Sequence, residues 1–540
     1  MFIKKKTFWL MLFLLIIGAY FRVIFINKPE GLWNDEYISW FVASIPYGKE
    51  FWDAVFWQCH MPFYYLYLKF FIHFFGNSDL LLRITSFIPG VLSIIPMYFV
   101  GKEFKDEKLG ILCASVTAFS SFLIYYSQEV RFYGLLFLFS ALVLLFMLKL
   151  LKKRNLSNII FYTFFNLLII FTHTIGFVFV FFNLIFVSYF LLKESENDSK
   201  AITYKVIFSL LGIIFLLSLI SLPLLIKILT SHPQSQWWGH FTLAKLGFLM
   251  TDYFSPVLTN LINAPDKFFV NVNLQFIIFK MLPVLIAVIG IIKAVSNENN
   301  KLSGLFYCFL AVIFVLSIAS ISGKLIFLTK YSIEIYPILI LLMSFGLLDF
   351  KKELRYFLIF WFCFFNLFYL LTNPASAPKL KRGEGNKLVA DLLQNAQLKE
   401  NDFIILNYYP KERFEKYFNF DKYNVISIHK GNFLKYINVK DKQSFRDIDD
   451  KFFDNKIKNL VLNKIKPNQK VAIINLNNVA MFSPFQIKVT LETEKTYRRI
   501  PFLFLAFSYI KNQEIQTLLK KLKATKLEKK GDWEIITFIK

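Results

Sequence analysis

The sequence has few cysteines and few charged residues for its length. Of its 540 residues, four are cysteine and 18% are charged. Cys113, Cys308 and Cys363 fall inside apolar runs and Cys59 stands apart, so the sequence shows no disulfide framework and no cysteine metal cluster. The apolar N-terminal stretch also lacks a small-residue cleavage site, and its length predicts a first membrane span that is not removed.

What the sequence has in abundance is apolar surface. Hydrophobic residues make up 56% of the chain, the mean hydropathy is +0.49, and Phe alone occurs 67 times. Phe suits a membrane-buried surface because its ring carries no polar atom that needs a partner. Apolar runs of span length, about 20 residues, recur through the first two thirds. The pattern predicts an all-α polytopic membrane protein.

The net charge of +25 fits the same class. In a soluble chain such a charge would indicate nucleic acid as a partner. Here many Lys and Arg residues lie in short loops between apolar runs, as expected for the cytosolic side of a membrane protein. We therefore expect membrane lipids as partners and no nucleic acid.

Counting apolar runs predicts about eleven transmembrane helices within residues 1–372. The basic N-terminus is placed in the cytosol, and the odd number of spans places the C-terminus outside. Residues 27–79 are expected to form a first outer loop with helices lying in the membrane interface. A longer outer loop is expected at "SHPQSQWWGHF" and the residues after it. The remaining spans are expected near residues 80–100, between 110 and 150 as an outward and an inward pair, and near 157–171, 175–192, 206–229, 274–292, 302–321, 332–348 and 356–371.

The composition changes after the last apolar run. Residues 373–386 are rich in Ser, Pro, Gly and Lys and predict a linker. Residues 387–540 predict a periplasmic α/β domain, with a helix at "GNKLVADLLQNA" and short strands at "DFIILN", "NVISIH", "VAIINL" and "WEIITFI". This part contains no Gly-x-Gly-x-x-Gly and no Walker motif.

Ionisable and aromatic residues gather at the predicted outer ends of the spans. Such groups are costly near a membrane and by default mark a functional path. The segments are "NDE" (Asp35, Glu36), "CHMPFYY" (His60, Tyr64, Tyr65), "SQEVRFY" (Glu129, Arg131, Tyr133), "FTHTIG" (His173) and "LTKYS" (Lys330, Tyr331).

Each of these segments also has a plainer interpretation. Asn34 would cap a helix whose first turn holds the two acids, and Ser127 would cap a helix starting at "QEVRFYGLL". Arg131 would reach toward the interface along its apolar stem, and His173 and Lys330 would be structural. His232 and His240 flank a Trp pair, but a metal site would need further ligands.

Taken together, the segments resemble a known family. The stretch from Phe8 to Gly176 is similar to the bacterial lipid-linked-sugar glycosyltransferases of GT-C fold, the group related to protein O-mannosyltransferases and to the aminoarabinose and galacturonic acid transferases that modify lipopolysaccharide. The matching elements are the first-loop acids, the His-Met-Pro-Phe-Tyr-Tyr segment, "YSQEVRFY" and "THTIG". Two departures are Met61 in place of a Pro and Lys330-Tyr331 in place of Arg-Tyr. The C-terminal part shows no such resemblance.

The resemblance implies transfer of a sugar from a polyprenyl-phosphate-linked donor to an envelope glycan, lipid or protein acceptor, with inversion, at the outer face of the bacterial cytoplasmic membrane. It implies Asp35 as the base, with Glu36 beside it orienting the loop or binding acceptor, and Arg131 and Lys330 on the donor phosphate. The residues implied in holding sugar and lipid are His60, Tyr64, Tyr65, Glu129, Tyr133, His173 and Tyr331. No cofactor is required, and a divalent cation is left open.

Two other functions compete with sugar transfer. A polysaccharide polymerase or ligase would also be multi-spanning with outer Arg and His residues, but it is expected to carry a large outer loop between spans. A sugar-lipid flippase would place charged or broken helices near the bilayer midplane. The candidate charges of this sequence lie at span ends instead.

Overall fold

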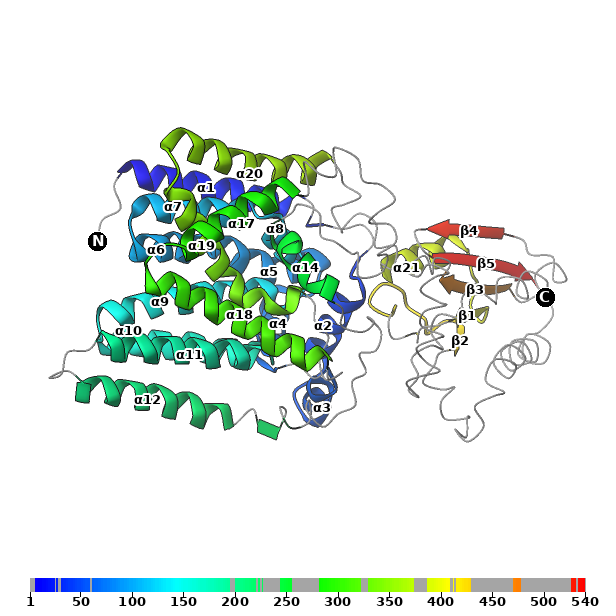
Figure 1. Cartoon of the computed structure of the whole chain (residues 1–540). Helices are drawn as coiled ribbons and strands as arrows, with labels where there is room; N and C mark the ends of the chain where they lie inside the picture. Colours follow the sequence, from blue (N-terminus) through cyan, green and yellow to red (C-terminus); the bar gives the residue numbers. More distant parts are fainter. Residues whose placement is uncertain are drawn as a thin grey trace. The chain divides into compact units, whose positions relative to one another are not determined.

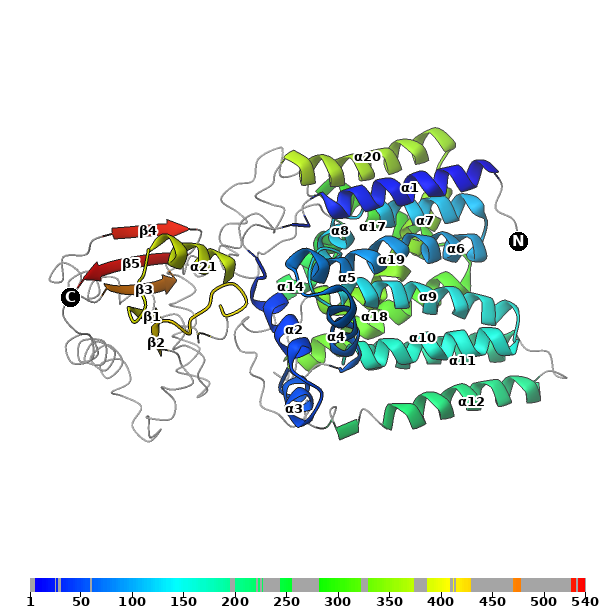
Figure 2. The same cartoon turned by 180° about the vertical axis from the view of Figure 1, so that it is seen from behind.

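The computed structural model of the chain consists of two compact units. One comprises Met1–Asn27 and Ile38–Leu380, and the other comprises Lys28–Tyr37 and Lys381–Lys540. Figures 1 and 2 show the elements of both units from opposite sides. The structure describes residues 5–24, 26–27, 31–58, 61–194, 200–219, 222–223, 226, 243–254, 281–321, 329–372, 386–407, 411, 414–428, 470–476, 526–530 and 533–539.

The first unit is a bundle of long helices that run side by side (Figure 1). Within the described ranges, six helical stretches are long and apolar enough to cross a membrane. These stretches are α1 (Lys5–Val23), α5 with α6 (Asp79–Phe104), α9 (Tyr133–Lys152), α11 (Gly176–Lys193), α18 (Asn300–Ile321) and the 3-10 helix η5 with α19 (Thr329–Leu348). The chain is thus a multi-pass membrane protein, which confirms the predicted class.

The remaining helices of the bundle are shorter or less apolar. They are α2 (Asn34–Ser44), which begins in the second unit, α3 (Lys49–Gln58), α4 (Phe63–Phe75), α7 (Glu107–Phe119), α8 (Ser121–Tyr126), α10 (Leu156–Thr172), α12 (Lys200–Leu219), α14 (Leu243–Phe254), α17 (Leu282–Val295) and α20 (Lys352–Thr372). Within the long stretches, α5 covers Asp79–Leu92, α6 covers Ile94–Phe104, η5 covers Thr329–Ile335 and α19 covers Tyr336–Leu348.

Polar residues in the turns fix where several helices begin. The Ser78 hydroxyl accepts from the Leu81 N–H at α5, and the Asp106 carboxylate accepts from the Leu109 N–H at 2.9 Å at α7. At the start of α10, the Asn155 side-chain oxygen accepts from the Asn158 N–H at 2.9 Å. Each side chain satisfies an N–H that has no partner inside its helix.

The predicted spans are helical in most of their described residues, and the structure adds two details to the prediction. The third span is interrupted at Ser120, whose hydroxyl caps α8 through the Leu123 N–H at 3.3 Å. The stretch predicted as outer loop after "SHPQSQWWGHF" contains α14. With 12 residues α14 is too short to span a membrane, so the length criterion passed over it. The residues 231–241 of that loop lie outside the described part.

Helices α17 and α19 pack closely against each other at a glycine in each helix. A Cβ at Gly346 of α19 would lie 1.8 Å from the Gly290 oxygen of α17, and a Cβ at Gly290 would lie 2.7 Å from the Met343 oxygen. Small residues allow helix backbones to come this close, which is a common means of packing in membranes.

The second unit contains a five-stranded mixed sheet in the order β2-β1-β3-β5-β4. The strands are β1 (Phe403–Asn407), β2 (Asn424–Ile428), β3 (Lys470–Leu476), β4 (Lys526–Lys530) and β5 (Trp533–Ile539). Strand β1 is parallel to both neighbours, and β5 is antiparallel to both of its own.

Helix α21 (Asn386–Asn395) contributes Leu388, Val389, Leu392 and Leu393 to the core that covers this sheet. The predicted helix and four predicted strands are all present. Strand β4, with the sequence Lys-Leu-Glu-Lys-Lys, was not predicted because it carries the charges typical of a sheet edge.

The glycine contact predicts a sharp difference between two substitutions. Gly346→Ala should lower the stability of the folded chain by about 2 kcal/mol or more, because the new methyl group overlaps the α17 backbone. Gly212→Ala in α12 should be neutral or slightly stabilising, since nothing lies within 4 Å of its Cβ position. Thermal unfolding in detergent would compare the two variants, and equal melting temperatures would contradict the close packing.

Candidate functional site

The two acids of "NDE" lie in the first turn of α2. The Glu36 carboxylate is fully buried, and its Oε2 accepts from the Trp33 N–H at 3.3 Å. A Glu that reaches back three residues to the backbone closes the start of a helix. Asp35, the next position toward the N-terminus, is half-buried. The two acids therefore have different surroundings, and Glu36 stabilises the start of the helix.

Arg131 lies inside the protein. Its side chain is 5% exposed, its Nη1 donates to the Ser39 hydroxyl of α2 at 3.2 Å, and its guanidinium carbon lies 5.1 Å from the centre of the Phe132 ring. The interpretation in which this side chain reaches out to the membrane interface is therefore wrong.

The turn that carries Arg131 connects α8 to α9. Ser127 was predicted to cap a helix beginning at Gln128, but α9 begins only at Tyr133 and Ser127 follows the end of α8. The Ser127 hydroxyl donates to the Leu123 oxygen at 2.5 Å and accepts from Arg22 Nε at 3.3 Å. The prediction failed because the hydroxyl accepts a hydrogen bond from the buried Arg22 of α1 and not from the start of a helix.

Arg22 fixes this turn against the bundle. Its guanidinium is fully buried and donates to the Gly18 and Ala118 oxygens at 3.0 Å and to the Thr117 oxygen at 2.9 Å. Gln128 adds a bond from its Nε2 to the Phe21 oxygen at 3.2 Å. The positions of Glu129, Arg131 and Tyr133 thus depend on α1.

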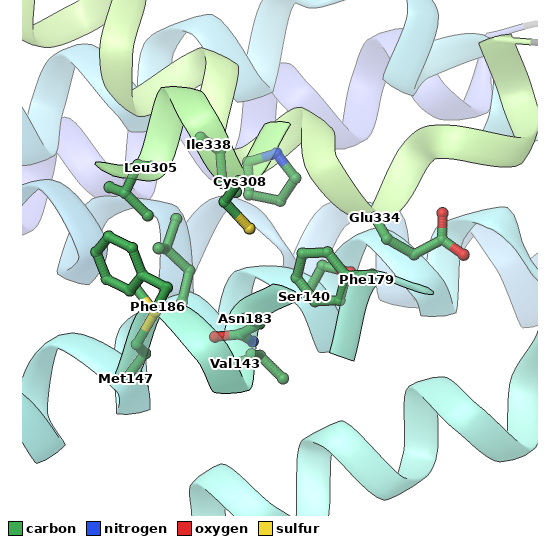
Figure 3. A pocket seen from close by; sticks show the side chains of 12 residues that line it. Ser140, Val143, Met147, Phe179, Asn183, Phe186, Leu305, Cys308, Glu334 and Ile338 are labelled. Carbon is green, nitrogen blue, oxygen red and sulfur yellow. The ribbon is translucent and has the colours of Figure 1, made fainter. Parts of the chain in front are cut away.

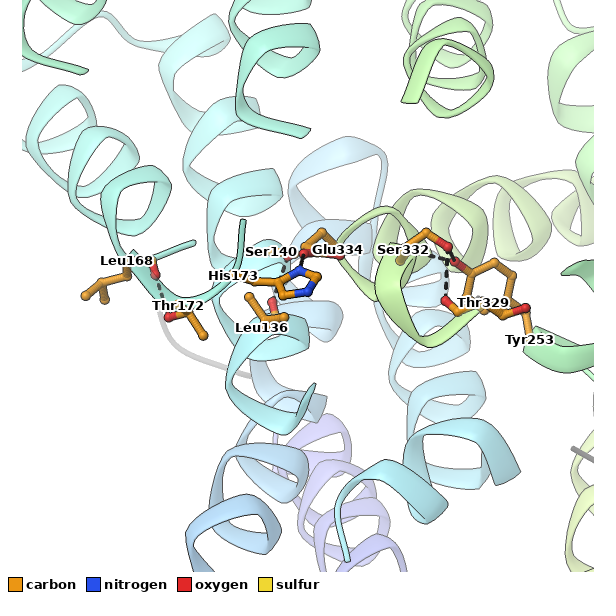
Figure 4. A network of polar contacts seen from close by, with 9 residues as sticks. All are labelled: Leu136, Ser140, Leu168, Thr172, His173, Tyr253, Thr329, Ser332 and Glu334. Atoms are coloured by element: carbon orange, nitrogen blue, oxygen red, sulfur yellow. Dashed lines mark hydrogen bonds and ion pairs between the residues drawn. The ribbon is translucent and has the colours of Figure 1, made fainter. Parts of the chain in front are cut away.

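His173 forms a buried pair with an acid that the sequence analysis missed. His173 Nδ1 lies 2.9 Å from Oε1 of Glu334 in η5, and the two side chains are 3% and 1% exposed (Figure 4). The imidazole ring lies 4.8 Å from the Phe132 ring and 5.9 Å from the Tyr331 ring. The signal for Glu334 was an acid in the otherwise apolar run "SIEIYPILIL".

Lys330 lies next to this His173–Glu334 pair and its aromatic neighbours. Its Nζ lies 5.3 Å from the centre of the Tyr331 ring and 5.8 Å from that of Tyr133, and both Lys330 and Tyr331 are only partly buried. A continuous chain of contacts therefore links six residues, in the order Arg131, Phe132, His173, Tyr331, Lys330 and Tyr133. The cluster joins three of the predicted segments, at the start of α9, the end of α10 and the start of η5.

The other predicted residues lie nearby or outside the described part. The Tyr64 ring lies 5.9 Å from both Phe132 and Tyr65, and both tyrosines are buried. Burial raises the pKa of Tyr64 and the positive charge of Arg131 opposes this, so the phenol stays protonated. Glu129 is buried and its backbone oxygen accepts from the Arg131 N–H at 2.7 Å. His60, like His232 and His240, lies outside the described residues.

Helix α14 holds η5 in place. The Tyr253 hydroxyl donates to the backbone oxygen of Ser332 at 2.6 Å and lies 2.7 Å from the Ser332 hydroxyl (Figure 4). The Thr329 hydroxyl donates to Asp252 at 2.7 Å, and the Tyr253 ring stacks on Tyr336 at 4.6 Å. The loop prediction therefore missed the helix that supports Lys330.

A small cavity of about 10 Å³ lies beside Glu334, among residues of α9, α11, α18 and α19 such as Ser140, Asn183 and Cys308 (Figure 3). This volume holds about one water molecule and no sugar. Lys330 and Tyr331 are the partly exposed residues of the cluster. In the described part of the chain, no three His, Cys, Asp or Glu side chains are placed to hold a metal ion.

Comparison with known proteins identifies the fold. No protein-family model matches the chain, and no curated protein matches it by sequence. The crystal structure of ArnT from Cupriavidus metallidurans in the apo state is similar over 98% of each chain, with a TM-score of 0.54 and 11% identity. The structure of ArnT bound to undecaprenyl phosphate is similar over 99% of this chain and 98% of that one, with a TM-score of 0.51 and 10% identity. The chain has the GT-C fold, as predicted.

The His173–Glu334 pair predicts a non-additive pair of substitutions. Glu334→Leu should destabilise the chain by about 1–3 kcal/mol, because it leaves the buried imidazole without its acceptor. The double variant His173→Leu/Glu334→Leu should lose less than the sum of the single losses. Thermal unfolding of the four proteins of this cycle in detergent measures the coupling, and additive effects would show that the two groups act independently.

Proposed function

We propose that the protein is a glycosyltransferase that moves a sugar from a polyprenyl-phosphate-linked donor to an acceptor hydroxyl or phosphate. The observation that carries this proposal is the cluster of Arg131, Lys330 and aromatic rings at one end of a GT-C bundle. The full-length similarity to ArnT, which was crystallised with undecaprenyl phosphate, supports the choice of lipid.

The cluster has the chemistry that a phosphate leaving group requires. Cations already in place stabilise the charge that develops as the bond to phosphate breaks, and the effect is larger where water is scarce. Lys330 is the partly exposed cation and would contact the phosphate as a point charge, whereas an arginine would bind it bidentately. Arg131 is buried against Ser39 and would add its field. Tyr133 and Tyr331 beside Lys330 offer rings and hydroxyls to the sugar.

Asp35 is the proposed base. The acceptor oxygen attacks the anomeric carbon, the bond from that carbon to the phosphate oxygen breaks, and Asp35 takes the hydroxyl proton. Polyprenyl phosphate or diphosphate leaves with the bonding electrons, and the anomeric centre inverts. The bond from the Trp33 N–H to the Glu36 carboxylate supports a loop-orienting role for Glu36 and leaves Asp35 as the proposed base.

We place this reaction at the outer face of a bacterial cytoplasmic membrane. In Figure 1 the end of the bundle opposite to the start of α9 carries the turns between α6 and α7 and between α9 and α10. Basic residues lie in these turns and in the helix ends beside them, namely Lys102, Lys105, Lys152, Lys153 and Arg154. Basic turns favour the cytosolic side. The cations of the cluster lie at helix starts, not at mid-helix, which favours a transferase over a flippase.

Replacement of the proposed base should affect chemistry more than binding. Asp35→Asn should lower kcat by about 10²- to 10⁴-fold while the KM for the lipid donor changes little, because the amide cannot take the proton. Asp53→Asn, an exposed acid in α3, is the matched control and should behave like wild type. Mass spectrometry of polyprenyl-linked sugars consumed in the presence of envelope acceptors gives both parameters. Full activity of the Asp35 variant would place the base elsewhere.

Replacement of the proposed phosphate ligand should weaken lipid binding. Lys330→Met should reduce the affinity for undecaprenyl phosphate by about 10- to 100-fold, which corresponds to a charge-assisted hydrogen bond. Lys293→Met is the control, because Lys293 also lies over a ring, that of Phe350 at 4.2 Å, at the end of α17. Native mass spectrometry in detergent measures binding directly, and equal affinities of the two variants would remove Lys330 from the phosphate site.

A further inference from the structure

The segment that leads into Asp35 belongs to the same compact unit as the C-terminal α/β domain. Residues Lys28–Tyr37 group with Lys381–Lys540. The Leu32 N–H donates to the Tyr417 hydroxyl at 2.9 Å, and the Leu32 oxygen accepts from the Asn386 N–H at 3.4 Å. The Leu32 side chain is fully buried. Both backbone groups of this residue are therefore bound by the C-terminal domain.

The residue before Leu32 admits no side chain. Gly31 has a φ of +79°, a conformation that favours glycine. A Cβ at this position would lie 2.8 Å from the Lys387 Cβ and 2.9 Å from the Tyr417 hydroxyl oxygen. The backbone of the first outer segment thus passes directly over α21 and Tyr417.

These contacts continue without a gap into the turn that carries the acids. Leu32 is followed by Trp33, whose N–H is held by the Glu36 carboxylate, and Asp35 lies between them in the same turn. A helix whose entry is fixed at successive residues begins at one position and in one direction. Tyr417 and the start of α21 therefore determine where the first turn of α2 lies within this unit.

We propose that the C-terminal α/β domain is a positioning element for the catalytic loop, with Tyr417 and Gly31 as its positioning residues. The domain binds Gly31–Leu32, the bound segment sets the start of α2, and the start of α2 carries Asp35. This role rests on the proposed function of Asp35. This role requires no contact between the domain and the substrate.

The test measures the position of the segment and the reaction separately, on the full chain in lipid nanodiscs. Tyr417→Phe removes the hydroxyl that accepts from Leu32. We expect faster hydrogen exchange of residues 31–37, a kcat lower by about 10-fold or more, and an unchanged KM for the lipid donor, because misplacement of a reacting group affects turnover first. Tyr423→Phe, which removes a hydroxyl from a ring stacked on Phe418 in the same domain, is the control and should change none of these.

A second pair of variants reaches the same segment without altering Tyr417. Gly31→Ala introduces both a strained φ and an overlap with Lys387 and Tyr417. Gly76→Ala has a similar φ of +91° but no atom closer than 4.0 Å, so it carries the strain alone. We expect kcat to fall about 10- to 100-fold further in Gly31→Ala than in Gly76→Ala.

The outcomes separate this role from the proposed function. Faster exchange together with a lower kcat in both variants, and neither in the controls, supports the positioning role. Unchanged exchange of residues 31–37 overturns it, and so does faster exchange with an unaltered kcat. If the wild-type chain consumes no donor at all, the proposed function fails, and the binding of the segment by the domain still stands or falls with the exchange data.

Discussion

A charge in the interior of a membrane bundle must be solvated by the protein itself, because neither water nor lipid does so there. Arg22 meets this requirement with three backbone oxygens and one hydroxyl. Two of the oxygens, those of Thr117 and Ala118, are available because they lie at the end of α7, where carbonyls have no partner inside the helix. Through these bonds the one guanidinium connects α1 with the end of α7 and with the turn at Ser127 that leads to Arg131.

The same requirement shapes the other side of the cluster. Glu334 and His173 come from segments 161 residues apart, and each supplies the other with a hydrogen-bond partner in the interior of the bundle. The pair fixes η5 against the end of α10, and η5 carries Lys330 next to Tyr133. An internal polar pair thus supports a partly exposed cation, which is an arrangement suited to a ligand that brings its own negative charge.

The sequence predicted the elements that depend on local pattern and missed those that depend on partners. Apolar runs gave the spans and alternating apolar residues gave β1, β2, β3 and β5, because burial of one face or of a whole helix is visible in the order of residues. Ser127 was misassigned because its partner, Arg22, lies 105 residues away. Glu334 and α14 were missed for the same reason. The partner of Glu334 is His173, which is distant in sequence, and the 12-residue helix α14 packs its Tyr253 on the equally distant Tyr336. Of the candidate site, the residues at Arg131, His173 and Lys330 were predicted singly, but their contact through Phe132 and Tyr331 was not predictable from spacing.

The bond between Leu32 and Tyr417 joins residues 385 positions apart. Contacts of such sequence separation form late, because the intervening chain must first be made and ordered. A ribosome that adds about 5–20 residues per second needs roughly 20–80 s to pass from one partner to the other. During that interval the backbone of Leu32 lacks Tyr417 and Asn386, so these two contacts form only after most of the bundle has been synthesised. Under the proposed function, Asp35 would reach its working position only once the C-terminal α/β domain, which is synthesised later, has folded.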